Sequence, residues 1–165
     1  MYILVDDILK YMSILKLIRT GNENLDFRQL VEMLNAELAI IDGDDHAFYN
    51  QYNGLQDIKH VVMAYQGDTP VGCGTIKHYD TAKVEIKRMY TIKTQRAQGI
   101  ASRLIVELEN WAEELGYQSL ILETGKRQED AVALYTKAGY KKIDNYGPYI
   151  GVDNSVCFYK PIHDH

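Results

Sequence analysis

The stretch that decides the fold reads Lys93-Thr94-Gln95-Arg96-Ala97-Gln98-Gly99-Ile100-Ala101-Ser102. The residues before it, 84–92, are rich in β-branched and aromatic side chains, which favours a strand. The residues after it repeat apolar side chains at the spacing of a helix with one buried face: Ile100, Ala101, Leu104, Ile105, Leu108, Ala112 and Leu115. A helix that begins just after Gly99 directs unpaired N–H groups and a positive dipole end at the loop. The stretch therefore predicts a phosphate-binding site.

Length and composition predict one domain over residues 1–165, with enough apolar residues (46%) to bury a core. The net charge of −5 argues against nucleic acid or an anionic membrane as a partner, because both select basic surfaces. Cys73 and Cys157 lie in apolar, strand-like segments without metal-ligand spacing, so we expect core thiols and no metal. The first twenty residues carry Asp6 and Asp7 and fit neither a signal peptide nor a membrane span, which predicts a cytoplasmic protein.

The N-terminal third predicts a strand followed by a helix. Residues 1–11 precede a second methionine and are either an extra helix or an extension, and residues 13–19 are expected to form the first strand. Asp26 with Gln29 is typical of a capping box, and Leu25 with Leu30 could form the matching hydrophobic staple. A helix should therefore begin at Asp26.

The middle of the chain predicts a hairpin and a bulged strand. Residues 59–65 and 70–76 flank a turn at 66–69, and the glycines at 72 and 74 indicate a bulge or a close backbone neighbour. In the strand at 82–92, Met89 falls out of phase with Tyr90, which one extra residue near 87–89 would explain.

The C-terminal half predicts a parallel crossover. The long helix should end at Gly116, residues 119–123 form a short buried strand, and residues 128–138 form a second helix ended by Gly139. Two β segments within residues 140–160 close the chain.

Two common phosphate loops are excluded by the glycine pattern. A Walker loop needs G-x-x-x-x-G-K-[ST], and Gly125-Lys126 lacks both the upstream glycine and the following hydroxyl. A dinucleotide fingerprint needs three glycines, and this loop has only Gly99.

The remaining pattern, Arg96-x-x-Gly99-x-Ala101, resembles the pyrophosphate motif R/Q-x-x-G-x-G/A of the GNAT superfamily of N-acetyltransferases. Residues 131–140 are similar to the family's second signature, A-x-x-L-Y-x-k-x-G-F/Y. The resemblance covers residues 12–160 with the elements in the family's order. It implies an α/β (α+β type) GNAT fold, a mixed, mostly antiparallel twisted sheet of about six or seven strands flanked by about four helices.

The resemblance implies acetyl-CoA as the co-substrate and a set of residues that bind it. In this chain the set is Met89, Tyr90, Thr91, Arg96, Ala97, Gln98, Gly99, Ile100, Ala101, Ser102, Gln128 and Tyr135. Small residues at 99 and 101 would let the backbone approach the diphosphate, and Arg96 would add charge. Gln128 stands where the family often has an asparagine that contacts the pantetheine arm.

The resemblance also implies three catalytic roles. The Met89 N–H would stabilise the oxyanion, and Tyr135, with an ordinary phenol pKa of about 10, would protonate the departing thiolate. Glu85, eleven residues before Arg96, is the expected base, with His78 and Glu123 as alternatives.

The predicted reaction is direct transfer of acetyl from acetyl-CoA to a primary amine of a small molecule, by a monomer or homodimer. The acceptor is expected to meet residues 42–52, whose acidic side chains favour a cation, and residues 146–153. Two alternatives stay open: an acyl-CoA-binding domain without activity, and an acetyltransferase for protein lysines or N-termini.

Overall fold

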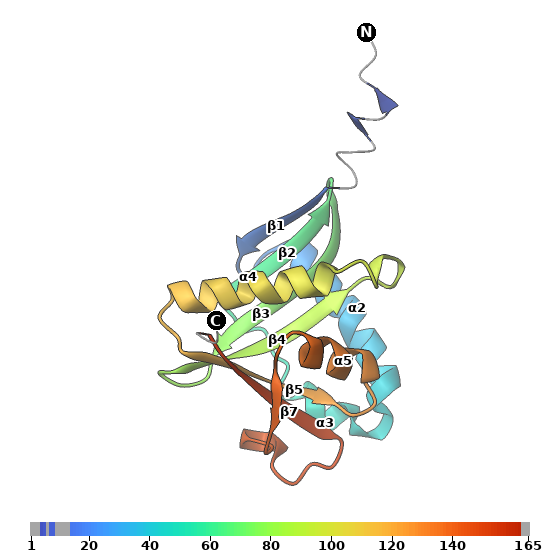
Figure 1. Cartoon of the computed structure of the whole chain (residues 1–165). Coiled ribbons are helices and arrows are strands. Elements are labelled where there is room, and N and C mark those ends of the chain that lie inside the picture. The colour runs from blue at the N-terminus through green and yellow to red at the C-terminus, as the bar shows by residue number, and fades with distance from the viewer. Residues whose placement is uncertain (1–3, 6, 9–13, 163–165) are drawn as a thin grey trace.

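The computed structural model describes residues 4, 5, 7, 8 and 14–162, and within them the chain forms a seven-stranded sheet in the order β1-β2-β3-β4-β5-β7-β6 (Figure 1). The strands are β1 (Leu15–Thr20), β2 (His60–Gln66), β3 (Thr69–His78), β4 (Lys83–Thr91), β5 (Ser119–Gly125), β6 (Lys141–Ile143) and β7 (Ser155–Pro161). Only β4 and β5 pair in parallel among these strands. The predicted extension over residues 1–11 lies largely outside the described residues.

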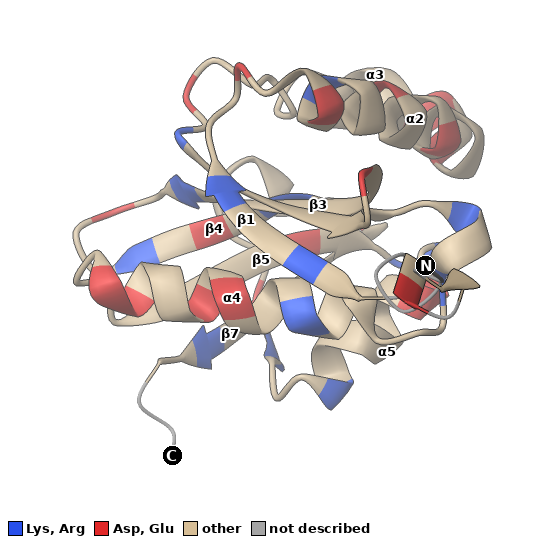
Figure 2. Cartoon of the chain, turned by 90° about the horizontal axis from the view of Figure 1, so that it is seen from above, with Lys and Arg blue, Asp and Glu red and all other residues tan. Residues whose placement is uncertain are grey.

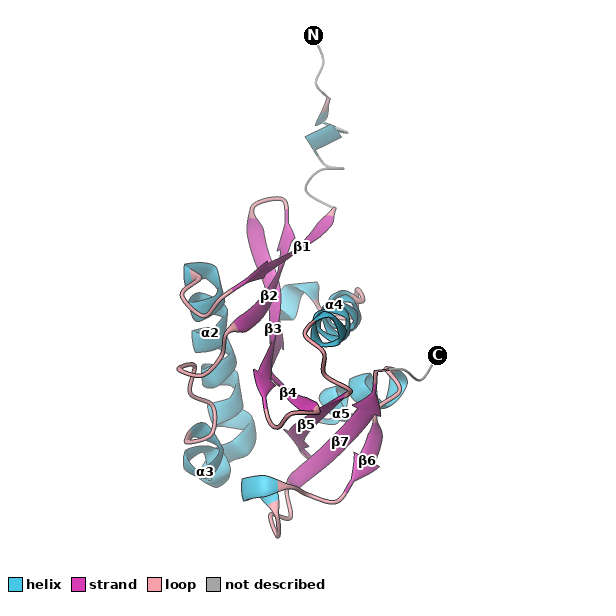
Figure 3. Cartoon of the chain, turned by 90° about the vertical axis from the view of Figure 1, so that its left-hand side faces the viewer, coloured by secondary structure: helices cyan, strands magenta, loops and turns pink. Residues whose placement is uncertain are grey.

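Helices cover both faces of the sheet, as Figure 3 shows: α2 and α3 lie on one side, α4 and α5 on the other. Their bounds are α2 (Leu25–Asp42), α3 (His46–Asn50), α4 (Ile100–Glu114) and α5 (Glu129–Lys137). One apolar layer forms between the sheet and α4 with α5, and a second between the sheet and α2. The predicted fold class is therefore confirmed, and Cys73 and Cys157 are both buried and free.

The helix after the phosphate loop follows its predicted pattern. Its buried residues are Ile100, Leu104, Ile105, Leu108 and Ala112. At its end, Gly116 has a φ of 90°. The Gly116 N–H donates to the Glu113 carbonyl (2.9 Å), and the Tyr117 N–H donates to the Ala112 carbonyl (3.1 Å). This is a Schellman motif, because both orphan carbonyls of the last turn are satisfied by residues past the helix end.

The predicted start of the first long helix is wrong. α2 begins at Leu25, and the cap is Asn24, whose side-chain oxygen accepts a hydrogen bond from the Phe27 N–H (3.0 Å). Asp26 instead accepts from the Tyr65 hydroxyl (2.7 Å). Leu25 is 81% exposed, so there is no hydrophobic staple. Asn and Asp are about equally good caps, so the local sequence did not distinguish them, and the contact with β2 gave Asp26 another role.

The bulge in β4 lies where the phase break predicted it. Between Cys73, paired with Tyr90, and Thr75, paired with Lys87, β4 contains one residue more than β3. Arg88, in the bulge, has a φ of 57°, which is uncommon for a residue with a Cβ. An added Cβ on Gly74, opposite the bulge, would lie 2.3 Å from the Met89 sulfur. Gly74 therefore makes room for the extra residue.

The two halves of the sheet separate along β4 and β5. These strands pair only over three positions, from Lys83 opposite Ser119 to Glu85 opposite Ile121. Beyond Glu85 the edge of β4 has no strand neighbour on that side among the described residues, while β5 continues its pairing with β7. The divergence leaves an opening that leads from the bulge to the phosphate loop.

Candidate active site

The loop between β4 and α4 presents unpaired backbone donors. The N–H groups of residues 97–102 have no acceptor among the described residues, and the first bond of the following helix runs from the Arg103 N–H to the Gly99 carbonyl (3.2 Å). Ala97 and Gly99 are left-handed, with φ of 62° and 80°. An added Cβ on Gly99 would meet nothing within 4 Å. Six consecutive free donors at the positive end of a helix make a strong anion site, so the loop fits a diphosphate.

The Arg96 side chain makes contacts that the sequence did not predict. Its guanidinium forms a bidentate pair with Glu37 of α2 (2.8 and 2.9 Å), and its Nε donates to the Thr91 carbonyl (2.8 Å). It also lies 5.5 Å from the centre of the Tyr90 ring. The charge that Arg96 was expected to add at the loop is thus offset by the Glu37 carboxylate.

A cavity of about 840 Å³ extends from the loop along the open edge of β4 to α2 and the start of α5. Every residue predicted for the site except Gln98 lines it: Glu85, Met89, Tyr90, Thr91, Arg96, Ala97, Gly99, Ile100, Ala101, Ser102, Gln128 and Tyr135. Gln128 lies at the N-cap of α5, with no hydrogen bond from its side chain to the helix. The fold therefore gathers residues from β4, the loop, α4 and α5 around one space.

Tyr135 is a buried phenol on the cavity wall. It is 5% exposed, its ring packs edge-on against Tyr140 (5.7 Å between centroids), and its hydroxyl makes no hydrogen bond to the described residues. Burial raises the pKa of this hydroxyl. Tyr135 is therefore protonated at neutral pH and free to donate.

Glu85 and Glu123 both line the cavity but differ in their surroundings. Glu85 accepts a hydrogen bond from the Tyr146 hydroxyl (2.5 Å) and lies 3.7 Å from the Lys87 ammonium. Glu123 accepts one from Ser155 (2.7 Å), and burial raises its pKa from 4.5 to about 7. A carboxylate with a pKa near neutrality suits a general base, so these contacts favour Glu123 over the predicted Glu85.

His78, the other alternative base, is absent from the lining of this cavity. Its Nδ1 is hydrogen-bonded to the Tyr117 hydroxyl (2.7 Å) just beyond the end of α4. His78 instead lines a second pocket of about 390 Å³, which includes Glu85 but not Glu123.

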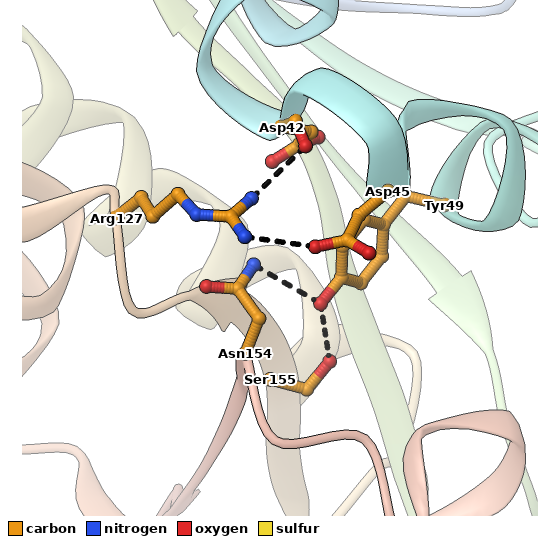
Figure 4. Close-up of polar contacts among 6 residues, drawn as sticks. All are labelled: Asp42, Asp45, Tyr49, Arg127, Asn154 and Ser155. Carbon is orange, nitrogen blue, oxygen red and sulfur yellow. Dashed lines mark hydrogen bonds and ion pairs between the residues drawn. The ribbon is translucent and has the colours of Figure 1, made fainter.

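The two segments predicted to meet the acceptor lie against each other. Tyr49 and Tyr149 stack (6.5 Å between ring centroids). Figure 4 shows how Arg127 ties this region together, with hydrogen bonds to the Asp42 carbonyl and the Asp45 carboxylate (both 2.9 Å). The figure also shows the Tyr49 hydroxyl between Ser155 (2.9 Å) and Asn154 (3.2 Å). These bonds connect the end of α2 and α3 to the loop after β5 and to β7.

The surface charge, the apolarity of the helices and the arrangement of possible metal ligands bear on the partners of this protein. Charges of both signs are interspersed along the strands and helices (Figure 2). No helix in the described part of the chain is long and apolar enough to cross a membrane. Across residues 14–162 and the few described before them, no group of three or more His, Cys, Asp and Glu side chains is placed to hold a metal ion.

Comparison with known proteins identifies the family. The Acetyltransferase (GNAT) family model matches residues 27–140. The IAA acetyltransferase of Azospirillum brasilense is 35% identical over 138 residues, which cover 81% of this chain and 89% of that protein. This chain belongs to the GNAT acetyltransferase family.

Solved structures of GNAT proteins share the fold of this acetyltransferase. A Klebsiella pneumoniae protein, provisionally assigned as an acyl-CoA N-acyltransferase, has a TM-score of 0.76 and 27% identity, covering 90% of this chain and 98% of that one. An aminoglycoside 6'-N-acetyltransferase bound to coenzyme A has a TM-score of 0.69 and 17% identity, covering 91% and 98%. GNAT neighbours therefore bind coenzyme A in this fold.

Sequence reasoning missed two arginines of this GNAT enzyme, Arg88 and Arg127, which both line the cavity. Arg88 lies at the phase break of β4, so the sequence marks its position but indicates no role for its side chain. Arg127 follows the end of β5, where a loop beside a sheet edge is a common place for site residues. Their partners are remote in sequence, so no local pattern indicated them.

Proposed function

We propose that this enzyme transfers an acetyl group from acetyl-CoA directly to a primary amine of a small molecule. The observation that carries the proposal is one cavity of about 840 Å³, whose lining includes the loop of free amides, Tyr135 and the candidate bases Glu85 and Glu123. Phosphate-binding donors, a proton donor and a base thus share a single space, which matches what acyl transfer to an amine requires.

At the coenzyme end, the backbone N–H groups of residues 97–102 would hold the diphosphate. The open edge of β4 at 89–91 would pair with the amides of the pantetheine arm, and Gln128 lies across from it on the cavity wall. When bound, acetyl-CoA supplies the acetyl thioester. Because Arg96 is paired with Glu37, the backbone amides and the helix dipole would provide most of the attraction.

At the reacting end, each proton has a residue to accept or supply it. Glu123 would take a proton from the amine as the new N–C bond forms. The Met89 N–H, at the bulge, would donate to the carbonyl oxygen as negative charge develops there. The Tyr135 hydroxyl would give its proton to the sulfur as the C–S bond breaks, since a phenol can protonate a thiolate. Neither cysteine lines the cavity, which supports direct transfer over a route through a cysteine thioester.

Two observations support a small acceptor. The segments proposed to meet the acceptor are joined by the Arg127 hydrogen bonds and by the stacking of Tyr49 on Tyr149, and all three residues line the cavity. The Azospirillum brasilense relative takes its name from IAA and not from a protein substrate.

A thioester-cleavage screen of amines, amino acids and aminoglycosides with acetyl-CoA tests the proposal. We expect turnover with at least one small amine and a loss of turnover in Tyr135→Phe. Coenzyme binding without turnover on the whole panel would support a binding domain instead. Transfer of labelled acetyl to lysate proteins, but to no small amine, would support a protein acetyltransferase.

A further inference from the structure

Arg88 is a buried guanidinium on the cavity wall with most of its donors unused. It is 5% exposed, and its Nη2 donates to the Asn35 side-chain oxygen on α2. Its Nε has no hydrogen-bond acceptor, and Asn35 is the one partner that the described residues offer its five N–H groups. A buried charge without a counterion is costly, so such a group usually has an anionic partner.

No carboxylate within the described chain supplies that partner. The ion pairs of these residues do not include Arg88. Glu37, on the same helix as Asn35, is held by Arg96, and Glu85 is held by Tyr146 and Lys87. The neighbouring Cys73 is a neutral thiol, because burial raises its pKa to about 12. An anion from outside the chain is the remaining way to compensate the charge.

The backbone of Arg88 is held in an unfavourable conformation at this place. Its φ of 57° lies in the left-handed region, and it belongs to the β4 bulge, without a pairing partner in β3. Such conformations are most often found where a side chain serves a site. Here the bulge places Arg88 against Asn35 of α2, on the wall of the cavity.

Carboxylates elsewhere in the lining of the same cavity could attract the cationic amine of an acceptor. Asp42 lies seven residues after Asn35 on α2, which is two helical turns and ~10 Å along the axis, on the same face. Asp42 is 4% exposed, with one carboxylate oxygen unpartnered, and it lines the cavity together with Glu123. The cavity therefore offers a cation near Asn35 and carboxylates further along.

We propose that Arg88 binds a carboxylate of the acceptor, so that the preferred acceptors are small amines that also carry a carboxylate, such as amino acids. This inference rests on the proposed function and specifies its substrate class. The coenzyme diphosphate would not need Arg88, because the unpaired amides of residues 97–102 are proposed to hold it. A planar guanidinium can hold a carboxylate through two parallel hydrogen bonds, which a simple ammonium cannot do.

The test compares matched acceptors in the thioester-cleavage assay: phenylalanine with phenethylamine, tyrosine with tyramine, and lysine with cadaverine. The intact enzyme should favour the carboxylate-bearing member of an accepted pair by roughly 10- to 100-fold in kcat/KM, the range expected for hydrogen bonds to a charged group. Arg88→Met should abolish this preference by raising KM for the carboxylate acceptor, with KM for acetyl-CoA unchanged. Arg103→Met, an exposed arginine on α4, is the matched control and should keep the preference.

Equal turnover of both members of the accepted pairs, unaffected by Arg88→Met, would overturn the inference and leave the proposed function intact. A rise in KM for acetyl-CoA in Arg88→Met would also overturn it, because Arg88 would then serve the coenzyme. Should no amine react, the proposed function fails. Calorimetry of the same amino acids in the presence of coenzyme A then decides the inference: binding to the intact protein but not to Arg88→Met supports it, and equal binding refutes it.

Discussion

At the scale of single residues, Tyr135 combines a packed ring with a proposed role as proton donor. Its ring lies in the apolar layer with Tyr140 and Phe158, and its hydroxyl has no partner among the described residues. The phenol thus contributes its ring to packing and keeps its proton for a ligand. The two contributions can be separated by substitution.

Tyr135→Phe should lower kcat by about 100-fold or more, because it removes the proton donor for the thiolate. The free energy of unfolding should change by less than about 1 kcal/mol, since the ring remains and no hydrogen bond within the described chain is lost. Steady-state kinetics and thermal denaturation check the two effects. An unchanged kcat would contradict the assignment of Tyr135 as the acid.

Glu123 should set the pH dependence of the reaction. Its pKa is raised from 4.5 to about 7, so kcat/KM should rise with pH up to about 7 and then level off. Glu123→Gln should lower kcat/KM by about 100-fold and remove this ionisation. If the ionisation survives in Glu123→Gln and disappears in Glu85→Gln, Glu85 is the base.

The same shift predicts a change in stability. The folded protein binds the Glu123 proton more tightly than the unfolded chain does. The contribution of Glu123 to the free energy of unfolding therefore falls as pH rises from about 4.5 to about 7. Glu123→Gln should therefore be more stable than the parent at pH 8, by up to about 3 kcal/mol, and equally stable at pH 4. Denaturant titrations at the two pH values measure this difference. Equal stability at pH 8 would show that burial does not penalise this carboxylate.

At the scale of elements, the two ends of α4 allow a matched comparison, because only one of them borders the cavity. α4 is bounded by Gly99 and Gly116, which have φ of 80° and 90° and open space where a Cβ would lie. Gly99 lines the cavity and Gly116 does not. The two glycines therefore share a backbone requirement and differ in their surroundings.

Gly99→Ala and Gly116→Ala should each destabilise the fold by about 1–2 kcal/mol, the cost of a left-handed residue with a Cβ. Only Gly99→Ala should weaken coenzyme A binding, by about 10-fold or more, because its methyl group enters the space that the diphosphate needs. Calorimetry with coenzyme A compares the two variants. Equal affinities would contradict the phosphate assignment of the loop.

At the scale of the whole molecule, the cavity lies where the two halves of the sheet part. Since β4 and β5 pair over only three positions, the open edge of β4 and the loop after it depend on α4 for support. A ligand in the cavity contacts both sides of the opening. Its binding should therefore protect backbone amides on both sides of the opening more than those at the far edge of the sheet.

Coenzyme A should slow amide hydrogen exchange most at residues 89–91 and 97–102, and least in β1. At a concentration 100 times its Kd it should stabilise the fold by about 2.7 kcal/mol, by mass action. Exchange measured by mass spectrometry with and without coenzyme A checks the pattern. Uniform protection of every strand would point to general stabilisation without a localised site.

The sequence predicted most elements because their signals are local. The periodicity of α4, the Gly116 stop and the phase break at Met89 each concern residues within a few positions of one another. The predicted cap of α2 was wrong, because a contact with β2 gives Asp26 another role and Asn24 caps the helix instead. The family signatures likewise lie in continuous stretches, so the residue pattern alone was enough to predict the fold and the coenzyme loop.

The residue pattern alone was sufficient to identify the fold and the acetyltransferase family, and it predicts the loop proposed to bind the coenzyme. The three-dimensional arrangement was needed to show that Arg96 pairs with Glu37, that burial raises the pKa of Glu123, and that Arg88 lines the cavity without a carboxylate partner among the described residues. The physical reason is that periodicity and turn chemistry act along the chain. Desolvation and charge pairing depend on which distant residues fold against one another.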